Sequence, residues 1–226
     1  METTLLQSLN MHFASYYRWR VATHYWGLPQ VFNGPILDIG ADDGRFLSQV
    51  KAPYKVGIDY STRPQVNFDW LQSNACYLPF ANDSFSHIFA FDVVEHIDND
   101  KAMLYEALRV LKPGGTLWLS TTAQKFVIFP GGFVQKRLEK SIGHVRQGYS
   151  ADILNDRLPS VASADIWWWN EPTFRFMYIF LYGLKRISYH LPNKLVPFLV
   201  SADSRFKHGY SGHLFARITK ANKTNS

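Results

Sequence analysis

Three aspartates crowd a glycine-containing turn near the start of the chain, in the stretch ILDIGADDGRFL at residues 36–47. Gly40 and Gly44 permit the tight turn and close backbone approach of a cofactor-binding loop that follows a first strand and leads into a helix. The carboxylates of Asp38, Asp42 and Asp43 would repel the pyrophosphate of a dinucleotide, and the spacing does not fit G-x-G-x-x-G. A cofactor with positive charge, such as S-adenosylmethionine with its ammonium and sulfonium groups, suits this loop better.

Another acid ends the next predicted strand. The segment YKVGIDYS places Asp59 at its tip, 21 positions after Asp38. An acid in this position can accept hydrogen bonds from both ribose hydroxyls of a nucleoside cofactor. The alternative for Asp59 is a turn acid or a helix N-cap.

The elements that must position these residues are short apolar runs that alternate with amphipathic or loop segments. The runs are PILDIG, YKVGIDY, HIFAFDVV and TLWLSTT, and GHLFARITK is a later strand candidate. Such alternation predicts a parallel sheet with helices on its faces. Between two runs, DNDKAMLYEALRVLKPGG has apolar residues at three- and four-residue spacings, which predicts a helix that ends at Pro113-Gly114-Gly115.

Four segments in order resemble the class I S-adenosylmethionine-dependent methyltransferases, in particular the small-molecule group called methyltransferase type 11. They are LDIGADDG, the acid in GIDYS, CYLPFANDSFSHIFAFDVVEHI and ALRVLKPGGTLWLS. The resemblance implies an α/β, doubly wound (Rossmann-like) fold: a mostly parallel seven-stranded sheet with helices on both faces. It also implies S-adenosyl-L-methionine as cofactor and S-adenosyl-L-homocysteine as product. After about residue 121 the alternation ends, and the aromatic and basic segments there predict either a helical, aromatic cap on the sheet or a small second lobe; we prefer the cap.

The expected organisation is a helical lead-in followed by one methyltransferase domain, since 226 residues suit a single domain. The lead-in covers residues 1–30 and the methyltransferase domain covers 31–226. Within that domain, we expect a cofactor-binding core at 35–121, a substrate-side cap with insertions at 122–210 and the last strand at 211–220.

The resemblance assigns cofactor contacts to individual residues. Asp38 and the backbone at Gly40 would face the methionine moiety, Asp59 the ribose and Asn74 the adenine amino group, while Asp92 would lie beside the transferring methyl group. The predicted cofactor-binding residues are Asp38, Gly40, Asp42, Gly44, Asp59, Tyr60, Asn74, Ala75 and Asp92.

Two of these residues depart from the family pattern. Asp42 replaces a glycine of the loop, although Asp tolerates left-handed backbone angles better than most residues. Asn74 replaces the usual Asp, although its side-chain oxygen can still accept a hydrogen bond. These departures motivate a rival hypothesis, a catalytically degenerate cofactor-binding or scaffold protein on the same fold.

Two histidines are candidate general bases for an acceptor that must lose a proton. His96 ends the stretch VVEH, and His144 lies in GHVRQGYSADIL, which resembles a His-bearing segment of methyltransferases acting on quinone-type acceptors. A loop-ordering hydrogen bond for His96 and a helix-cap role for His144 are the alternatives. Arg146 and Tyr149 are candidates to orient an anionic or phenolic group of the acceptor, although Arg146 could equally be a solvated charge.

The predicted activity is methyl transfer to a small lipophilic or conjugated acceptor, with O-methylation preferred over C- or N-methylation because candidate bases exist. No metal is expected, because no His/Cys cluster has ligand spacing along the sequence. The net charge of +6 would allow a nucleic acid partner. We expect no nucleic acid partner, since FDVVEH lacks the Asn/Asp-Pro-Pro-aromatic motif typical of base-amino methyltransferases and no dense basic stripe is present.

Residues 166–200 combine aromatic rings with spaced basic residues. We expect amphipathic helices there, lining a lipophilic substrate entrance and docking on an anionic membrane surface. The alternative is core packing of a helical cap. A single cysteine excludes an internal disulfide, and there is neither a signal-peptide pattern nor an apolar run of about 18 residues, so we expect a cytoplasmic protein, peripheral at most to a membrane.

Overall fold

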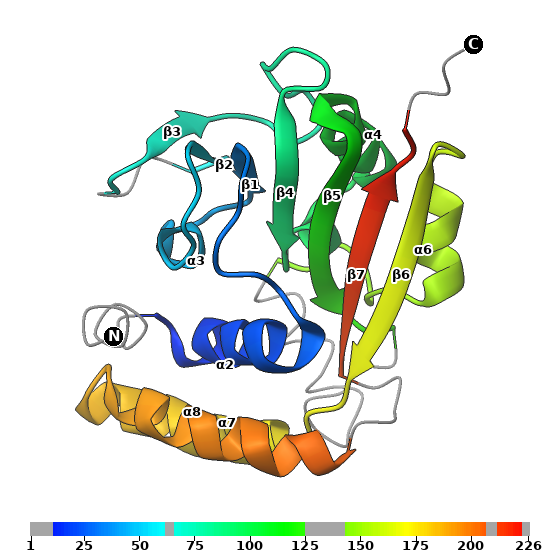
Figure 1. Cartoon of the computed structure of the whole chain (residues 1–226). Helices are drawn as coiled ribbons and strands as arrows, with labels where there is room; N and C mark the ends of the chain where they lie inside the picture. Colours follow the sequence, from blue (N-terminus) through cyan, green and yellow to red (C-terminus); the bar gives the residue numbers. More distant parts are fainter. Residues whose placement is uncertain (1–10, 62–65, 125–142, 207–211, 223–226) are drawn as a thin grey trace.

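The computed structural model describes residues 11–61, 66–124, 143–206 and 212–222. These residues form one seven-stranded sheet with the strand order β3-β2-β1-β4-β5-β7-β6 (Figure 1). The strands are β1 (Ile36–Ile39), β2 (Lys55–Asp59), β3 (Asp69–Gln72), β4 (Phe85–Phe91), β5 (Leu111–Thr122), β6 (Ala162–Trp169) and β7 (His213–Lys220). β7 runs antiparallel to both of its neighbours, and the pairs from β3 through to β5 are parallel. The predicted mostly parallel seven-stranded sheet is confirmed.

Helices cover both faces of the sheet, as predicted. They are α2 (Phe13–Val21), α3 (Arg45–Ser48), α4 (Asp100–Val110), α6 (Ala151–Arg157), α7 (Pro172–Ile187) and α8 (Leu191–Asp203). Helices α4 and α6 lie on one face, and α2 and α3 lie on the other. Figure 1 shows α7 and α8 below α2, beyond the carboxyl ends of the parallel strands.

The alternation of side chains along the strands produces two apolar cores, one on each face of the sheet. In β5, Leu117 and Leu119 pack into the core that contains α4, whereas Trp118 packs into the core that contains α2. β7 repeats the pattern, with Leu214 on the α4 side and Phe215 on the α2 side. Strands buried on both faces explain why the apolar runs of the sequence are nearly continuous.

The predicted helix after β4 is α4, which ends earlier than expected. The side chain of Asn99 caps its first turn by accepting a hydrogen bond from the backbone N–H of Ala102 at 3.1 Å. The helix stops at Val110, because Leu111 already has extended backbone angles. Residues 112–115, expected as the helix end, belong to β5.

The expectation of amphipathic helices across residues 166–200 is wrong at its start, because 166–169 belong to strand β6. The strand has a two-residue period: Ala164 and Ile166 pack against the α4 core, while Ser163 and Asp165 are exposed. The predicted cap segment 122–210 therefore contains a strand of the sheet as well as helices α7 and α8. Residues 125–142 of that segment lie outside the described residues.

A buried polar group ties the cap to the N-terminal helix. The hydroxyl of Tyr17 in α2 donates to the Asp203 carboxylate at 2.6 Å and accepts from the indole N–H of Trp169 at 2.9 Å. The same carboxylate accepts the backbone N–H groups of Thr173 and Phe174, the first turn of α7. Asp203 thus holds α2, α7 and the end of α8 together, with the end of β6 joined through the tyrosine.

Candidate functional site

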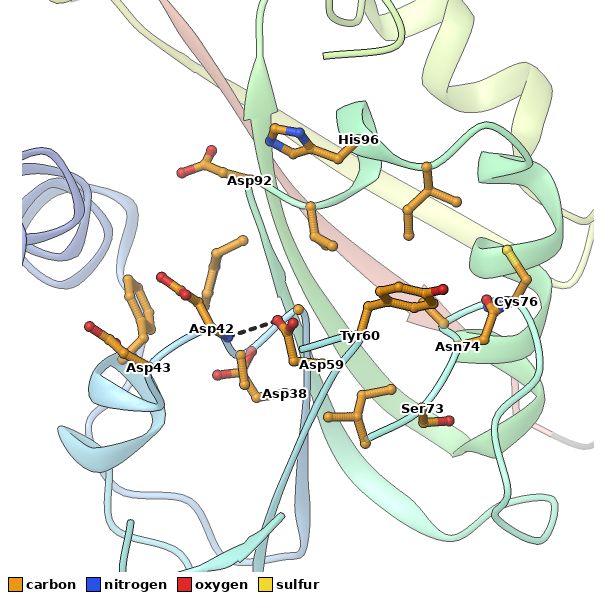
Figure 2. A pocket seen from close by; sticks show the side chains of 18 of the residues that line it. Asp38, Asp42, Asp43, Asp59, Tyr60, Ser73, Asn74, Cys76, Asp92 and His96 are labelled. Carbon is orange, nitrogen blue, oxygen red and sulfur yellow. Dashed lines mark hydrogen bonds between the residues drawn. The ribbon is translucent and has the colours of Figure 1, made fainter. Parts of the chain in front are cut away.

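A cavity of about 1090 Å³ lies at the carboxyl ends of β1, β2 and β4 (Figure 2). Its walls come from the turn after β1, the tip of β2, the loops after β3 and β4, and helix α2. Nine residues predicted to act in the site line it: Asp38, Gly40, Asp42, Asp59, Tyr60, Asn74, Ala75, Asp92 and His96. The predicted residues Gly44, His144, Arg146 and Tyr149 are not among its described lining residues.

Asp38, at the third position of β1, is a buried acid with one unpartnered oxygen. Its side chain is only 3 % exposed, and its Oδ2 atom has no hydrogen-bond partner. Burial first, and then the nearby carboxylate of Asp59, raise the pKa of Asp38 well above its ordinary value. Such a group is costly for the protein alone, and a bound cation would remove that cost.

The turn after β1 forms with Asp42 in the place of a glycine. Gly40 has a positive φ of 72°, and a Cβ atom there would lie 2.5 Å from a methyl carbon of Val93. Asp42 has a φ of 48°, a left-handed angle that Asp adopts more readily than most residues. Its backbone N–H donates to Oδ2 of Asp59 at 3.0 Å, the dashed line in Figure 2. The tip of β2 therefore holds the acidic turn in shape.

Gly44, the second glycine of the motif, is the N-cap residue before α3 and is not among the described residues that line the cavity. It has a φ of 71°, and a Cβ atom there would lie 2.6 Å from a methyl carbon of Val66. The motif thus needs glycine at this position for the close packing of the turn.

Asp59 and Asn74 both organise turns while lining the cavity. Asp59 accepts hydrogen bonds from the backbone N–H and the hydroxyl of Ser61 at 2.8 and 2.7 Å. Asn74 accepts the backbone N–H of Cys76 at 2.9 Å. Asp59 therefore has the turn role that the sequence analysis gave as its alternative, and it also lines the cavity.

The cavity carries strong negative charge. Six of its described lining residues are aspartates: Asp38, Asp42, Asp43, Asp59, Asp92 and Asp98. Burial and the carboxylates of Asp43 and Asp59 also raise the pKa of Asp42. Arg18 of α2 is the one Lys or Arg among the described lining residues. Such a lining favours a cationic ligand over a phosphate.

Arg18 is a site residue that the sequence analysis missed. Its guanidinium forms an ion pair with Asp92, which follows β4 and also accepts the hydroxyl of Ser120 at 3.1 Å. The imidazole of His213 lies 3.6 Å from Asp92 on one side and 3.1 Å from the Glu171 carboxylate on the other. Burial alone would raise the pKa of Asp92, but Arg18 and His213 lower it. Asp92 is therefore ionised and held in a fixed position.

His96 and His144 meet at the end of β4, although 48 residues separate them. Their rings lie 4.7 Å apart between centroids in an edge-to-face arrangement, and Nδ1 of His96 lies 3.1 Å from the Gly143 carbonyl oxygen. Glu95 beside them is 1 % exposed and accepts the hydroxyl of Thr121 at 2.9 Å. Burial, and next the charge of Asp92, raise the pKa of Glu95 to about 7.

Arg146 and Tyr149, expected to orient the acceptor, are both engaged in a buried network. Tyr149 is fully buried, and its hydroxyl donates to Asp100 at 2.7 Å. Arg146 forms an ion pair with Asp100 and donates to the Tyr149 hydroxyl and the Ile97 carbonyl. Arg157 of α6 forms a second ion pair with Asp100. These contacts join the loop before α4 to the segment before α6.

Comparison with known proteins agrees with this geometry. The family model for a methyltransferase domain matches residues 37–119. O-methyltransferase rstn1 of Aspergillus nomiae is 33% identical over 100 residues, covering 36% of this chain and 44% of that protein. The biotin biosynthesis bifunctional protein BioHC of Cellvibrio japonicus is 32% identical over 97 residues, covering 38% of this chain and 19% of that protein. The chain thus spans less than half the length of either relative.

Solved structures share the fold over nearly the whole chain. An S-adenosylmethionine-dependent methyltransferase from Mesorhizobium loti is 16% identical with a TM-score of 0.59, covering 91% of this chain and 97% of that one. Phosphoethanolamine N-methyltransferase 2 of Haemonchus contortus, in complex with S-adenosyl-L-methionine, is 18% identical with a TM-score of 0.61, covering 91% and 52%. At these identities the likeness concerns the fold. The family model thus identifies residues 37–119 as a methyltransferase domain, and the described residues share the fold of solved methyltransferases.

Proposed function

We propose that this chain, whose residues 37–119 are a methyltransferase domain, transfers the methyl group of S-adenosyl-L-methionine to a small acceptor and releases S-adenosyl-L-homocysteine. The observation that carries the proposal is the Asp38 carboxylate, which is buried at the cavity with an unpartnered Oδ2 atom. The ammonium group of the cofactor's methionine moiety would supply the missing cation. The other aspartates of the lining suit the positive sulfonium.

The other cofactor contacts are inferred from hydrogen-bond-accepting oxygen atoms of residues that line the cavity. A carboxylate offers about four lone-pair positions and the turn contacts use three of them, so Asp59 keeps one on Oδ2 for a ribose hydroxyl while it holds the acidic turn. The Asn74 oxygen similarly has a second lone pair for the adenine amino group. The cofactor would then extend from the tip of β2 to Asp92, at the end of β4.

The acceptor is proposed to be small and lipophilic or conjugated, and to be methylated on oxygen. Apolar and aromatic side chains contribute to the cavity wall: Met11, Phe46, Tyr60, Tyr77 and Phe91. Transfer requires the acceptor oxygen to attack the methyl carbon as the carbon–sulfur bond breaks, so positioning supplies much of the catalysis. The similarity to an O-methyltransferase supports oxygen as the methylated atom.

Calorimetric titration with S-adenosyl-L-methionine and S-adenosyl-L-homocysteine tests the cofactor site. We expect binding by the wild type and a loss of about 10- to 150-fold in Asp59→Ala, since hydrogen bonds to a charged group contribute about 1.5–3 kcal/mol. Asp69→Ala is the matched control, because Asp69 lies on neighbouring β3, bonded to Tyr54, outside the described cavity lining. No binding of either ligand by folded wild-type protein would refute the proposal and favour the scaffold hypothesis.

We also propose that α7 docks on an anionic membrane, from which a lipophilic acceptor could reach the cavity. Its outer face presents Phe176, Ile179, Phe180 and Ile187, of which Phe176 is 86 % exposed. Arg186 is exposed beside them, which suits anionic headgroups. The contact would be peripheral, because none of the helices in the described ranges has the length and apolar character needed to cross a bilayer.

Flotation with phosphatidylserine vesicles at low salt tests this docking. We expect wild type and Val161→Ser to float with the vesicles and Phe176→Ser with Ile187→Ser to remain behind. Val161 is a suitable control, since it is exposed just before β6. Equal flotation of all proteins, or none by the wild type, would refute the docking surface.

A further inference from the structure

Glu95, His96 and His144 form a cluster with the donor atoms of a metal site. One ring nitrogen from each histidine and one carboxylate oxygen of Glu95 all lie within 4.8 Å of one another. Donor atoms around a tetrahedral zinc ion are about 3.4 Å apart, given bonds of about 2.1 Å. Small rotations of these side chains would therefore close the cluster around an ion.

The surroundings hold two of the three donors in place. Because a carbonyl oxygen can only accept, the contact of His96 with Gly143 puts the proton on Nδ1 and leaves the lone pair of Nε2 for a metal. The Thr121 hydroxyl and, more weakly, the Thr122 backbone N–H orient the carboxylate of Glu95. Second contacts of this kind are usual for metal-binding histidines and carboxylates.

The charge of the cluster also favours a cation. Glu95 is buried close enough to Asp92 for the two carboxylates to interact, and Asp92 and His96 both line the cavity. An ion held by Glu95 and the two histidines would therefore lie at the cavity's edge. Three protein ligands leave at least one coordination position for a molecule in the cavity, which is the arrangement of catalytic metal sites.

We propose that Glu95, His96 and His144 bind one divalent transition-metal cation, such as Zn²⁺ or Mn²⁺, at the acceptor end of the cavity. Two imidazoles and a carboxylate suit these ions better than Mg²⁺ or Ca²⁺, which favour oxygen ligands. The histidines then act as ligands instead of general bases. The sequence shows no metal-ligand spacing because His144 is far from Glu95 and His96 along the chain. The fold brings His144 to the end of β4, beside them.

The cation's role rests on the proposed methyl transfer. An acceptor hydroxyl bound to the metal has a lowered pKa, so its O–H bond breaks and the proton passes to solvent water. The resulting oxyanion forms the new O–CH₃ bond while the carbon–sulfur bond breaks, and that electron pair remains on the sulfur of S-adenosylhomocysteine. The site thus identifies the acceptor class as a hydroxyl compound able to coordinate a metal, such as a phenol or catechol.

Titration of chelator-treated protein with ZnCl₂ and MnCl₂, followed by calorimetry and by Mn²⁺ electron paramagnetic resonance, tests the site directly. We expect one ion per wild-type chain and at least tenfold weaker binding in His144→Ala and Glu95→Gln. His24→Ala is the matched control, because His24 is exposed at the end of the N-terminal helical segment. Circular dichroism verifies that each variant is folded.

Either of two results would overturn the proposal: no binding by wild type, or the same affinity and stoichiometry in wild type and His144→Ala. The titration contains neither cofactor nor acceptor, so its failure leaves the proposed methyl transfer intact. Conversely, protein that binds metal but not S-adenosylmethionine would refute the proposed function and keep the metal site.

Discussion

Asp38→Asn is expected to stabilise the free protein and weaken its cofactor binding. The carboxyl group of Asp38 is buried with an unpartnered oxygen, and burial and Asp59 raise its pKa well above the ordinary value of 3.8. The ionised form therefore disfavours the folded state at neutral pH, and each pKa unit corresponds to about 1.4 kcal/mol. We expect the amide to raise the free energy of unfolding by about 1–2 kcal/mol, a typical cost of an unsatisfied buried group.

The same substitution removes the charge that would hold the cofactor's ammonium group. A charge-assisted hydrogen bond contributes about 1.5–3 kcal/mol, so the affinity for S-adenosylmethionine should fall about 10- to 150-fold. Urea denaturation and calorimetric titration at pH 7 measure the two effects. Asp165→Asn is the control, since Asp165 is an exposed acid paired with Arg217. A variant that loses stability and keeps its affinity would refute this account of Asp38.

Three further predictions concern backbone geometry and pH. Gly40→Ala should lower the free energy of unfolding by about 1–3 kcal/mol in urea denaturation, because its φ is positive and its new Cβ would collide with Val93. Gly183→Ala, in the middle of α7 with nothing within 4 Å of the new Cβ, should instead raise it by about 0.5–1 kcal/mol, and a loss at Gly183 would contradict the geometric reasoning. For His213, burial alone would lower the pKa, but the Glu171 carboxylate raises it above the ordinary 6.5. Its protonated form therefore stabilises the fold fully below about pH 6.5, and that contribution is lost as pH rises through the raised pKa. The free energy of unfolding should fall there by up to about 1.4 kcal/mol per pH unit, and a His213→Gln variant with the same slope would disprove the assignment.

The part of the site that consists of residues directly after predicted strands could be predicted. The acidic turn after β1 and the acid at the tip of β2 follow strand ends, and the carboxyl ends of parallel strands meet at one edge of a sheet. The apolar alternation likewise predicted the sheet, because strands buried on both faces leave continuous apolar runs. Even the tolerance of a left-handed angle at Asp42 follows from the chemistry of its side chain.

Residues brought in by tertiary packing could not be predicted in the same way. Arg18 belongs to a helix whose neighbours are aromatic, and nothing local indicates that it reaches Asp92. His144 meets His96 only through the folding of the chain after β5. Strand β6 was not predicted, because a run of tryptophans also suits the apolar face of an amphipathic helix. The two-residue period of the preceding positions is the signal that indicates a strand.

The bond between Tyr17 and Asp203 joins residues 186 positions apart, so it bears on how the protein is made. Because α2 precedes them along the chain, it leaves the ribosome well before the helices that cover it and before β7, which inserts between β5 and β6. Until those elements are synthesised, the aromatic side of α2 is exposed and can bind chaperones or cause aggregation. Because Arg18 on this same helix forms part of the cavity wall, the binding site is completed only when the last strand is in place.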